Sequence, residues 1–249
     1  LYLYDLDGKF KNEFELSSKM LNDSIIFPYP YISTNLPLVR HKNNLYLTGY
    51  HAGEFPDKRY KQRKTVNKYN IKSNRLERIV NYPDLYNKFN WGTTYYYITS
   101  ATYNPTTESM IINFPLCHDL YVYDLVEERG NYVYSGSSKI KEIEPFSEDK
   151  NDLLDSNARL EYYITNASYI SIYYDIYKKI YYRLAALPMN KKSQYDKDFW
   201  KKRQYKLIVL NEKFESIEEI DLKGILPENI FITEKGIPLH VFSNEYVMK

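Results

Sequence analysis

Short runs of apolar and aromatic residues alternate along the chain with polar turn sequences, and this pattern predicts antiparallel β-hairpins. The clearest example covers residues 120–134, where a strand at 120–125 and a strand at 131–134 flank a polar turn that contains Gly130. Apolar and aromatic residues occupy both faces of the first strand. The same design recurs along the chain, which indicates a repeat protein.

The recurrence predicts three complete units of four strands. Their expected strands are residues 38–40, 45–50, 65–71 and 76–80 in the first unit, 95–103, 109–114, 120–125 and 131–134 in the second, and 169–177, 180–187, 205–210 and 217–222 in the third. A hairpin over residues 1–16 precedes them, half a unit over 230–242 follows them, and 149–160 suits one short helix. Asp5, Asn70, Asp124 and Asn211 recur at strand ends, where such side chains accept hydrogen bonds from nearby backbone.

Consecutive four-stranded antiparallel units are typical of a β-propeller, in which neighbouring blades bury each other's faces. We therefore predict an all-β fold: a β-propeller of four-stranded antiparallel blades, with three whole blades and two terminal half blades in a single domain over residues 1–249. Either the half blades pair and close a four-bladed ring, or the chain is a fragment of a larger propeller. Chain ends inside strand patterns favour the fragment, and two packed antiparallel sheets are the structural alternative.

The composition and net charge argue against several classes of protein. The net charge of +2 argues against a dedicated nucleic-acid binder, and no apolar run approaches the ~18 residues that a membrane span needs. A single cysteine, Cys117, excludes an internal disulfide framework. The 29 tyrosines suit strands, which explains them more simply than a set of aromatic platforms for sugars or bases.

The strand Leu-Tyr-Val-Tyr-Asp-Leu at 120–125, its counterpart at 1–6, and the long aromatic, Asn-rich and Lys-rich loops resemble the six-bladed propeller proteins of gut Bacteroides. Among these, the chain looks most like an uncharacterised lipoprotein family, a domain of unknown function. The resemblance covers most of the chain and rests on strand patterns. It implies export to the periplasm or an outer-membrane-anchored place in the cell envelope, and a chain that lacks about two of six blades. It implies no reaction.

Two basic loops, at residues 52–64 and 188–204, each join a second to a third strand and therefore open on one face of a propeller. The candidate ligand-binding residues on these loops and on the blade-linking stretch are Arg59, Tyr60, Arg63, Trp91, Tyr195, Trp200, Lys201 and Arg203. Basic groups interleaved with aromatic rings suit an anionic, stackable ligand such as an acidic glycan or a single-stranded nucleic acid. The alternative is that the charges serve solubility and the rings pack on the blades.

Three histidines, His51, His118 and His240, lie near the ends of second strands in three blades, which would direct them to that same face. Converging imidazoles suit a divalent metal, and such a site resembles that of propeller-type polyuronate lyases. Glu54 and Asp119 would complete the shell or act as general base. No metal motif with local spacing accompanies them, and no other cofactor is predicted.

Catalytic motifs are lacking. The sequence has no nucleophile elbow, phosphate-binding glycine loop or metalloprotease helix, and strand neighbours such as Cys117 and His118 point to opposite faces. We therefore expect an exported binding or interaction module whose ligand is a glycan or an envelope partner protein, with no catalytic residue. The alternative function is a metal-assisted, polyuronate-active enzyme that uses the three histidines.

Overall fold

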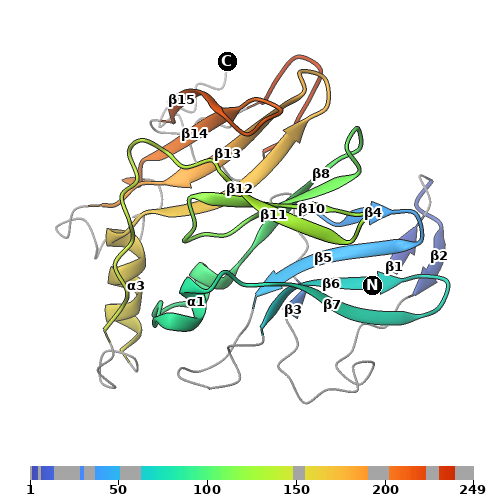
Figure 1. Cartoon of the computed structure of the whole chain (residues 1–249), viewed down its shortest axis with the longest axis horizontal. Coiled ribbons are helices and arrows are strands. Elements are labelled where there is room, and N and C mark those ends of the chain that lie inside the picture. The colour runs from blue at the N-terminus through green and yellow to red at the C-terminus, as the bar shows by residue number, and fades with distance from the viewer. Residues whose placement is uncertain are drawn as a thin grey trace, which may run out of the picture.

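The structure is a computed structural model that describes residues 2–4, 7–13, 29–30, 37–50, 63–147, 155–189, 202–222 and 230–238. Within these ranges the fold is nearly all β, with three antiparallel sheets that lie side by side (Figure 1). The first sheet holds β4 (Val39–His41), β5 (Asn44–Tyr50), β6 (Lys64–Asn70) and β7 (Arg75–Asn81), with the short β3 (Tyr29–Pro30) paired to β5. The second holds β8 (Ser100–Asn104), β9 (Ser109–Asn113), β10 (Asp119–Asp124) and β11 (Arg129–Tyr134). The third holds β12 (Ser168–Asp175), β13 (Ile180–Ala186), β14 (Tyr205–Leu210) and β15 (Ser216–Leu222).

The remaining elements are a hairpin of β1 (Tyr2–Tyr4) and β2 (Phe10–Glu13) and three short helical segments. These segments are α1 (Leu85–Lys88), the 3₁₀ helix η3 (Thr94–Tyr97) and α3 (Ser156–Thr165). None of the described helices is both long and apolar enough to cross a membrane.

Burial is lowest in the fourth strands of the second and third sheets. Every residue of β9 and of β14 is buried, whereas the fourth strands β11 and β15 are mostly exposed. The first strands β8 and β12 lie against each other and join the second and third sheets. Because buried first strands face one another and exposed fourth strands lie outside, the arrangement is propeller-like, and the described sheets do not close a ring. The predicted fold class, all β with three four-stranded antiparallel units, is confirmed.

The polar residues predicted at strand ends do make the turns. The side-chain oxygen of Asp124 accepts hydrogen bonds from the backbone N–H groups of Val126 and Glu127, at 2.8 and 2.9 Å. Asn70 and Asn211 bond the backbone beyond their own strands in the same way. Side-chain acceptors therefore fix these third-to-fourth turns, while Asp5 lies outside the described residues.

Four local predictions differ from the structure. Residues 95–97 form part of η3 rather than a strand, because the rings of Tyr96 and Tyr97 are buried by packing that overrides their strand propensity. Gly130 lies inside β11, and Glu128 adopts the positive φ of the turn, at 53°. The helix predicted over 149–160 begins at Ser156 and ends at Thr165. Asp155 precedes it, and its side chain accepts a hydrogen bond from the Asn157 N–H at 2.8 Å. Of the half unit predicted over 230–242, residues 230–238 contain a tight turn, and the rest falls outside the described part.

Gly130 shows why a strand position can require glycine. A Cβ at this position would lie 2.5 Å from the Val122 carbonyl oxygen and 2.8 Å from the Tyr121 ring. Gly130→Ala should therefore lower the free energy of unfolding by about 1–3 kcal/mol, as overpacking does. Urea unfolding measures the loss, with the exposed neighbour Asn131→Ala as the control. Equal stabilities of the two variants would contradict the close approach.

Candidate ligand-binding pocket

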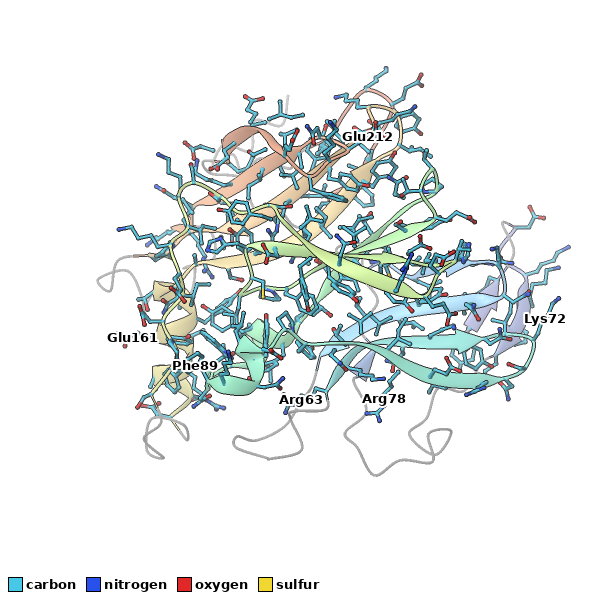
Figure 2. All side chains as sticks on the ribbon, viewed as in Figure 1. Arg63, Lys72, Arg78, Phe89, Glu161 and Glu212 are labelled. Atoms are coloured by element: carbon cyan, nitrogen blue, oxygen red, sulfur yellow. The ribbon has the colours of Figure 1, made fainter. Side chains whose placement is uncertain are left out.

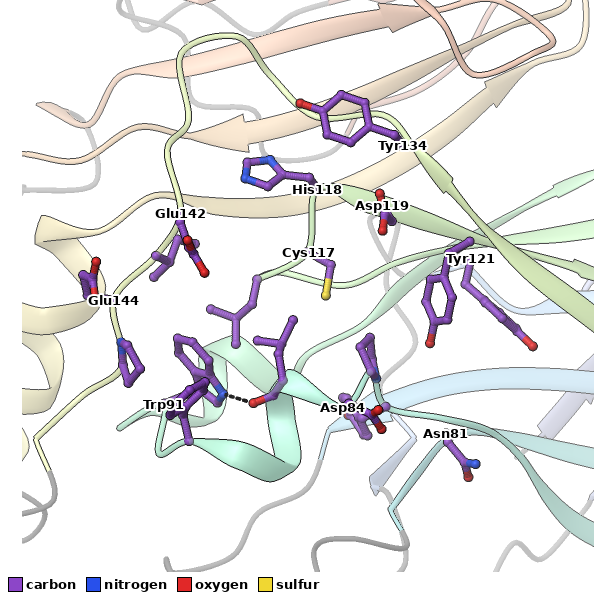
Figure 3. A pocket seen from close by; sticks show the side chains of 18 of the residues that line it. Asn81, Asp84, Trp91, Cys117, His118, Asp119, Tyr121, Tyr134, Glu142 and Glu144 are labelled. Atoms are coloured by element: carbon purple, nitrogen blue, oxygen red, sulfur yellow. Dashed lines mark hydrogen bonds between the residues drawn. The ribbon is translucent and has the colours of Figure 1, made fainter.

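A partly open pocket of about 1200 Å³ lies on the edge of the molecule formed by the blade-linking segments (Figure 3). It is lined by residues from 81–91, which follow β7, from 116–119, which join β9 to β10, and from 142–145, which follow β11. Side chains of β10 and β11 complete it. These are connections between blades and between second and third strands, and in a propeller both kinds open on the same face.

Aromatic rings form much of the lining: Tyr82, Phe89, Trp91, Tyr121, Tyr132 and Tyr134. Tyr121 and Tyr132 are register partners on β10 and β11, with ring centroids 4.8 Å apart. The Tyr132 side chain is 46% exposed, so its ring is available to a ligand. Trp91 is only 3% exposed and is held by a 3.2 Å hydrogen bond from its Nε1 to the Leu85 carbonyl. The aromatic lining therefore combines fixed and accessible rings.

The charged side chains of the lining are acidic. They are Asp84, Asp119, Glu142 and Glu144, and no lysine or arginine of the described ranges accompanies them. In Figure 3 the two glutamates lie on one side of the pocket and the two aspartates on the other. Asp84 makes no side-chain bond to the start of α1. The pKa of Tyr132 is raised to about 12, chiefly by burial, with the Cys117 thiol and the Asp84 and Asp119 carboxylates adding to the shift.

His118 lies beside Tyr134 in the pocket and bonds to the next sheet (Figure 3). Its Nδ1 is 2.8 Å from the Tyr169 hydroxyl oxygen, which accepts the Ser137 N–H at 3.0 Å. We assign the hydroxyl hydrogen to Nδ1, which leaves Nε2 as the N–H of a neutral ring. Burial, and secondarily the charge of Arg183, lowers the pKa of His118. The imidazole is therefore a neutral polar group of the pocket at pH 7.

The loop that carries His118 is fixed by the buried guanidinium of Arg183, which extends from β13 of the next sheet. Its Nη atoms donate to the carbonyls of Cys117 at 2.6 Å, His118 at 2.5 Å and Ser135 at 2.9 Å. Its Nε donates to the Asn113 side chain at 2.8 Å, and its Cζ lies 3.6 Å from the centroid of the Tyr169 ring. Burial lowers the pKa of Arg183 to about 10, so the group stays charged at pH 7.

Two of the predicted cationic ligand-binding residues, Arg63 and Arg203, are buried, with exposures of 4% and 3%. Arg63 lies over the Tyr97 ring, 5.2 Å from its centroid, and Arg203 donates to the carbonyls of Leu187 and Asn166 at 3.2 and 2.7 Å. Both precede a third strand, and both guanidiniums lie inside the fold rather than on the exposed loop surface that the sequence suggested. Burial among rings and carbonyls explains the difference.

The other predicted site residues divide into two groups. Trp91 and His118 come together in the pocket. Outside the described residues lie Arg59, Tyr60, Tyr195, Trp200, Lys201, His51 and His240, together with Glu54. No cluster of three or more His, Cys, Asp or Glu residues suited to a metal occurs in the described ranges. The metal site with His51 and His240 stays a prediction.

Sequence reasoning missed the tyrosines of the pocket and the arginine that supports it. Tyr121 and Tyr132 look like ordinary strand residues, since tyrosine is common in strands throughout the chain. Arg183 interrupts an otherwise apolar strand at 180–187. A lone charged residue in a buried strand is the signal that would have indicated a structural hydrogen-bonding role.

The propeller-like fold and the lined pocket define the class: an all-β protein with a concave site on its blade-linking edge. The family described as "Domain of unknown function (DUF4221)" matches residues 1–221, so the chain belongs to this family. A search of the curated proteins gives no match.

One solved structure supports the fold. A DUF4221 family member from Bacteroides vulgatus ATCC 8482 superposes with a TM-score of 0.66 at 20% identity, over 82% of this chain and 56% of that chain. This chain thus spans little more than half the length of that neighbour. Hydrazine synthase from Kuenenia stuttgartiensis is too dissimilar to support an inference about this chain, with a TM-score of 0.37 and 8% identity over 76% of this chain and 36% of that chain. The same holds for acylaminoacyl peptidase from Pyrococcus horikoshii (TM-score 0.41, 11% identity, 79% and 25%).

Arg183→Met should lower the free energy of unfolding by about 3–5 kcal/mol, because it removes the donors that satisfy three buried carbonyls. The exposed Arg129→Met, at the start of β11, should change it by less than about 0.5 kcal/mol. Denaturant unfolding compares the two variants. A loss for Arg183→Met no larger than that for the control would contradict the role of the guanidinium.

His118 should titrate below the ordinary histidine pKa of about 6.5. Since the unfolded chain then binds this proton more readily than the folded chain, His118 lowers stability as the pH falls through 6.5 toward the folded pKa. Proton NMR of the imidazole signals measures the midpoint, and His118→Gln identifies the signal by its loss. A midpoint at or above about 6.5 would contradict the burial of the ring.

Proposed function

We propose that the protein is a binding module that holds a saccharide in the aromatic and acidic pocket. The observation that carries this proposal is the combination of accessible tyrosine rings with carboxylates around one cavity. The C–H faces of a sugar ring pack on aromatic rings, and its hydroxyls donate to carboxylates through charge-assisted hydrogen bonds. A largely preformed cavity with a few polar groups is the usual form of such a site.

The sign of the pocket's charge changes the ligand expected from the sequence. The two basic loops suggested an anionic ligand, but most of their residues lie outside the described ranges, and Arg63 and Arg203 are buried. Four carboxylates line the described pocket and repel an acidic glycan. A neutral or cationic saccharide fits this site better. The same repulsion disfavours the polyuronate-active alternative at this pocket, because that substrate is a polyanion.

The proposed cellular setting is the envelope of a Bacteroides-type bacterium, with the protein exported to the periplasm or held at the outer membrane as a lipoprotein. The support is the resemblance of the strand pattern to such a family, together with the Bacteroides vulgatus origin of the structural neighbour. A six-bladed propeller for the whole protein belongs to the same proposal. A partner protein of the envelope is the other candidate ligand, and the saccharide is favoured because the site is concave.

Tyr132→Ala tests the saccharide proposal. A glycan array identifies the neutral or cationic saccharide that binds most tightly, and calorimetry then measures its affinity for the variants. Removing the accessible ring should weaken binding by about tenfold, the value of one aromatic contact of about 1.4 kcal/mol. Tyr177→Ala is the control, because Tyr177 is 58% exposed at the turn after β12 and lies outside the pocket.

Two results would refute the proposal. One is an array without any neutral or cationic ligand. The other is equal affinity of the wild type and Tyr132→Ala for the ligand that the array identifies. Circular dichroism spectra of both variants establish that the exposed substitutions leave the fold intact.

A further inference from the structure

The carboxylates of the pocket form no ion pair with the described residues. Glu142 and Glu144 follow β11, Asp119 begins β10 and Asp84 precedes α1, so three chain segments bring four carboxylates to one cavity. No ion pair of the described residues involves any of the four, and among these residues no lysine or arginine lines the pocket. The lowered pKa of His118 keeps its imidazole neutral at pH 7.

Three carboxylates elsewhere in the described part of the fold bind donors of the chain itself. Glu128 pairs with the Lys68 ammonium at 2.5 Å, and Glu108 bonds His41 at 2.9 Å. Glu219 accepts from Ser137 Oγ at 2.9 Å and the Ser138 N–H at 2.7 Å. The chain thus satisfies these acids with its own donors. The pocket carboxylates leave their acceptor sites for a ligand, and their negative charge attracts a cation.

The aromatic lining favours a cation as well. The rings of Tyr121 and Tyr132 present electron-rich faces, and the raised pKa of each keeps it a neutral phenol at pH 7. An ammonium within about 6 Å of such a face is attracted by the ring quadrupole. Aromatic rings and carboxylates therefore act in the same direction on a positive group, whereas carboxylates alone would not distinguish a cavity from an ordinary acidic surface.

From these observations, and resting on the proposed saccharide function, we infer that the pocket selects a sugar that bears a free ammonium group, such as a glucosamine unit in place of glucose or N-acetylglucosamine. The ammonium lies among the carboxylates and the ring packs on the tyrosines. N-acetylation removes the charge and adds bulk, and a uronate is repelled. Specificity thus comes from the substituent at one carbon of the sugar.

Three trisaccharides with the same β-1,4-linked backbone test this inference by calorimetry at pH 6. Cellotriose carries hydroxyls at the distinguishing carbon, triacetyl-chitotriose carries acetamides, and the glucosamine trimer carries ammonium groups. The glucosamine trimer should bind at least about tenfold more tightly than either neutral trimer. Raising the salt from about 50 mM to about 500 mM should remove most of this advantage through screening.

The variant Glu142→Gln/Glu144→Gln removes two charges without changing side-chain size. It should weaken the glucosamine trimer by about tenfold and leave the neutral trimers within about twofold. Glu212→Gln is the matched control, since Glu212 is exposed at the turn between β14 and β15, away from the pocket (Figure 2). Both glutamates of the double variant are exposed, so folding is retained.

The outcomes separate this inference from the function on which it rests. Neutral trimers that bind as tightly as the glucosamine trimer would overturn the inference and leave the saccharide site intact. No binding of any saccharide, including the array ligands, would overturn both. The last measurement is the affinity of the protein for trilysine, which carries ammonium groups without sugar rings. If trilysine binds as tightly as the glucosamine trimer, the ammonium alone is recognised and the amino-sugar assignment is overturned.

Discussion

The buried guanidinium of Arg183 is the interaction on which the described architecture depends. One side chain of the third sheet donates to the carbonyls of Cys117, His118 and Ser135 in the second sheet. These carbonyls lie where β9 turns into β10 and where β11 ends. A charged group in the interior is costly unless its donors are satisfied, and here four acceptors and the face of Tyr169 satisfy it. The guanidinium thereby joins two sheets and fixes one side of the pocket.

The contacts of Arg183 between the second and third sheets also fix the geometry of the pocket. Tyr169, over which the guanidinium lies, bonds the imidazole of His118, so the residue that faces the cavity is held from the neighbouring sheet. On the opposite side, the Trp91 indole is fixed by the Leu85 carbonyl. Rigid support of this kind reduces the ordering cost of binding a ligand. Asp84, Glu142 and Glu144 need no such support because they lie on exposed connecting segments, where carboxylates stay solvated until a ligand arrives, while Asp119 begins β10 and is partly exposed.

Strand order was predictable from the sequence because period-two patterns and polar turns are local signals. Every strand of the three sheets was anticipated within a few residues, apart from the two-residue β3, and Asp124 and its counterparts were recognised as turn residues. The 3₁₀ segment at Thr94–Tyr97 was missed because the burial of its tyrosines is decided by distant partners such as Tyr163. For the same reason, the sequence predicted that Trp91 and His118 lie on one face but could not show that Tyr132 and four carboxylates lie beside them. Which loop residues converge on a cavity is a property of the assembled sheets.

The most direct test of the account is a nitrogen–proton NMR titration of the protein with the glucosamine trimer. The account predicts that the perturbed amides cluster in the segments that line the pocket: residues 81–91, 116–121, 130–134 and 142–145. Perturbations confined instead to residues 51–64 and 190–204 would show that the saccharide binds at the basic loops and would contradict the proposed pocket. Shifts spread evenly over the chain would mean that no defined saccharide site exists.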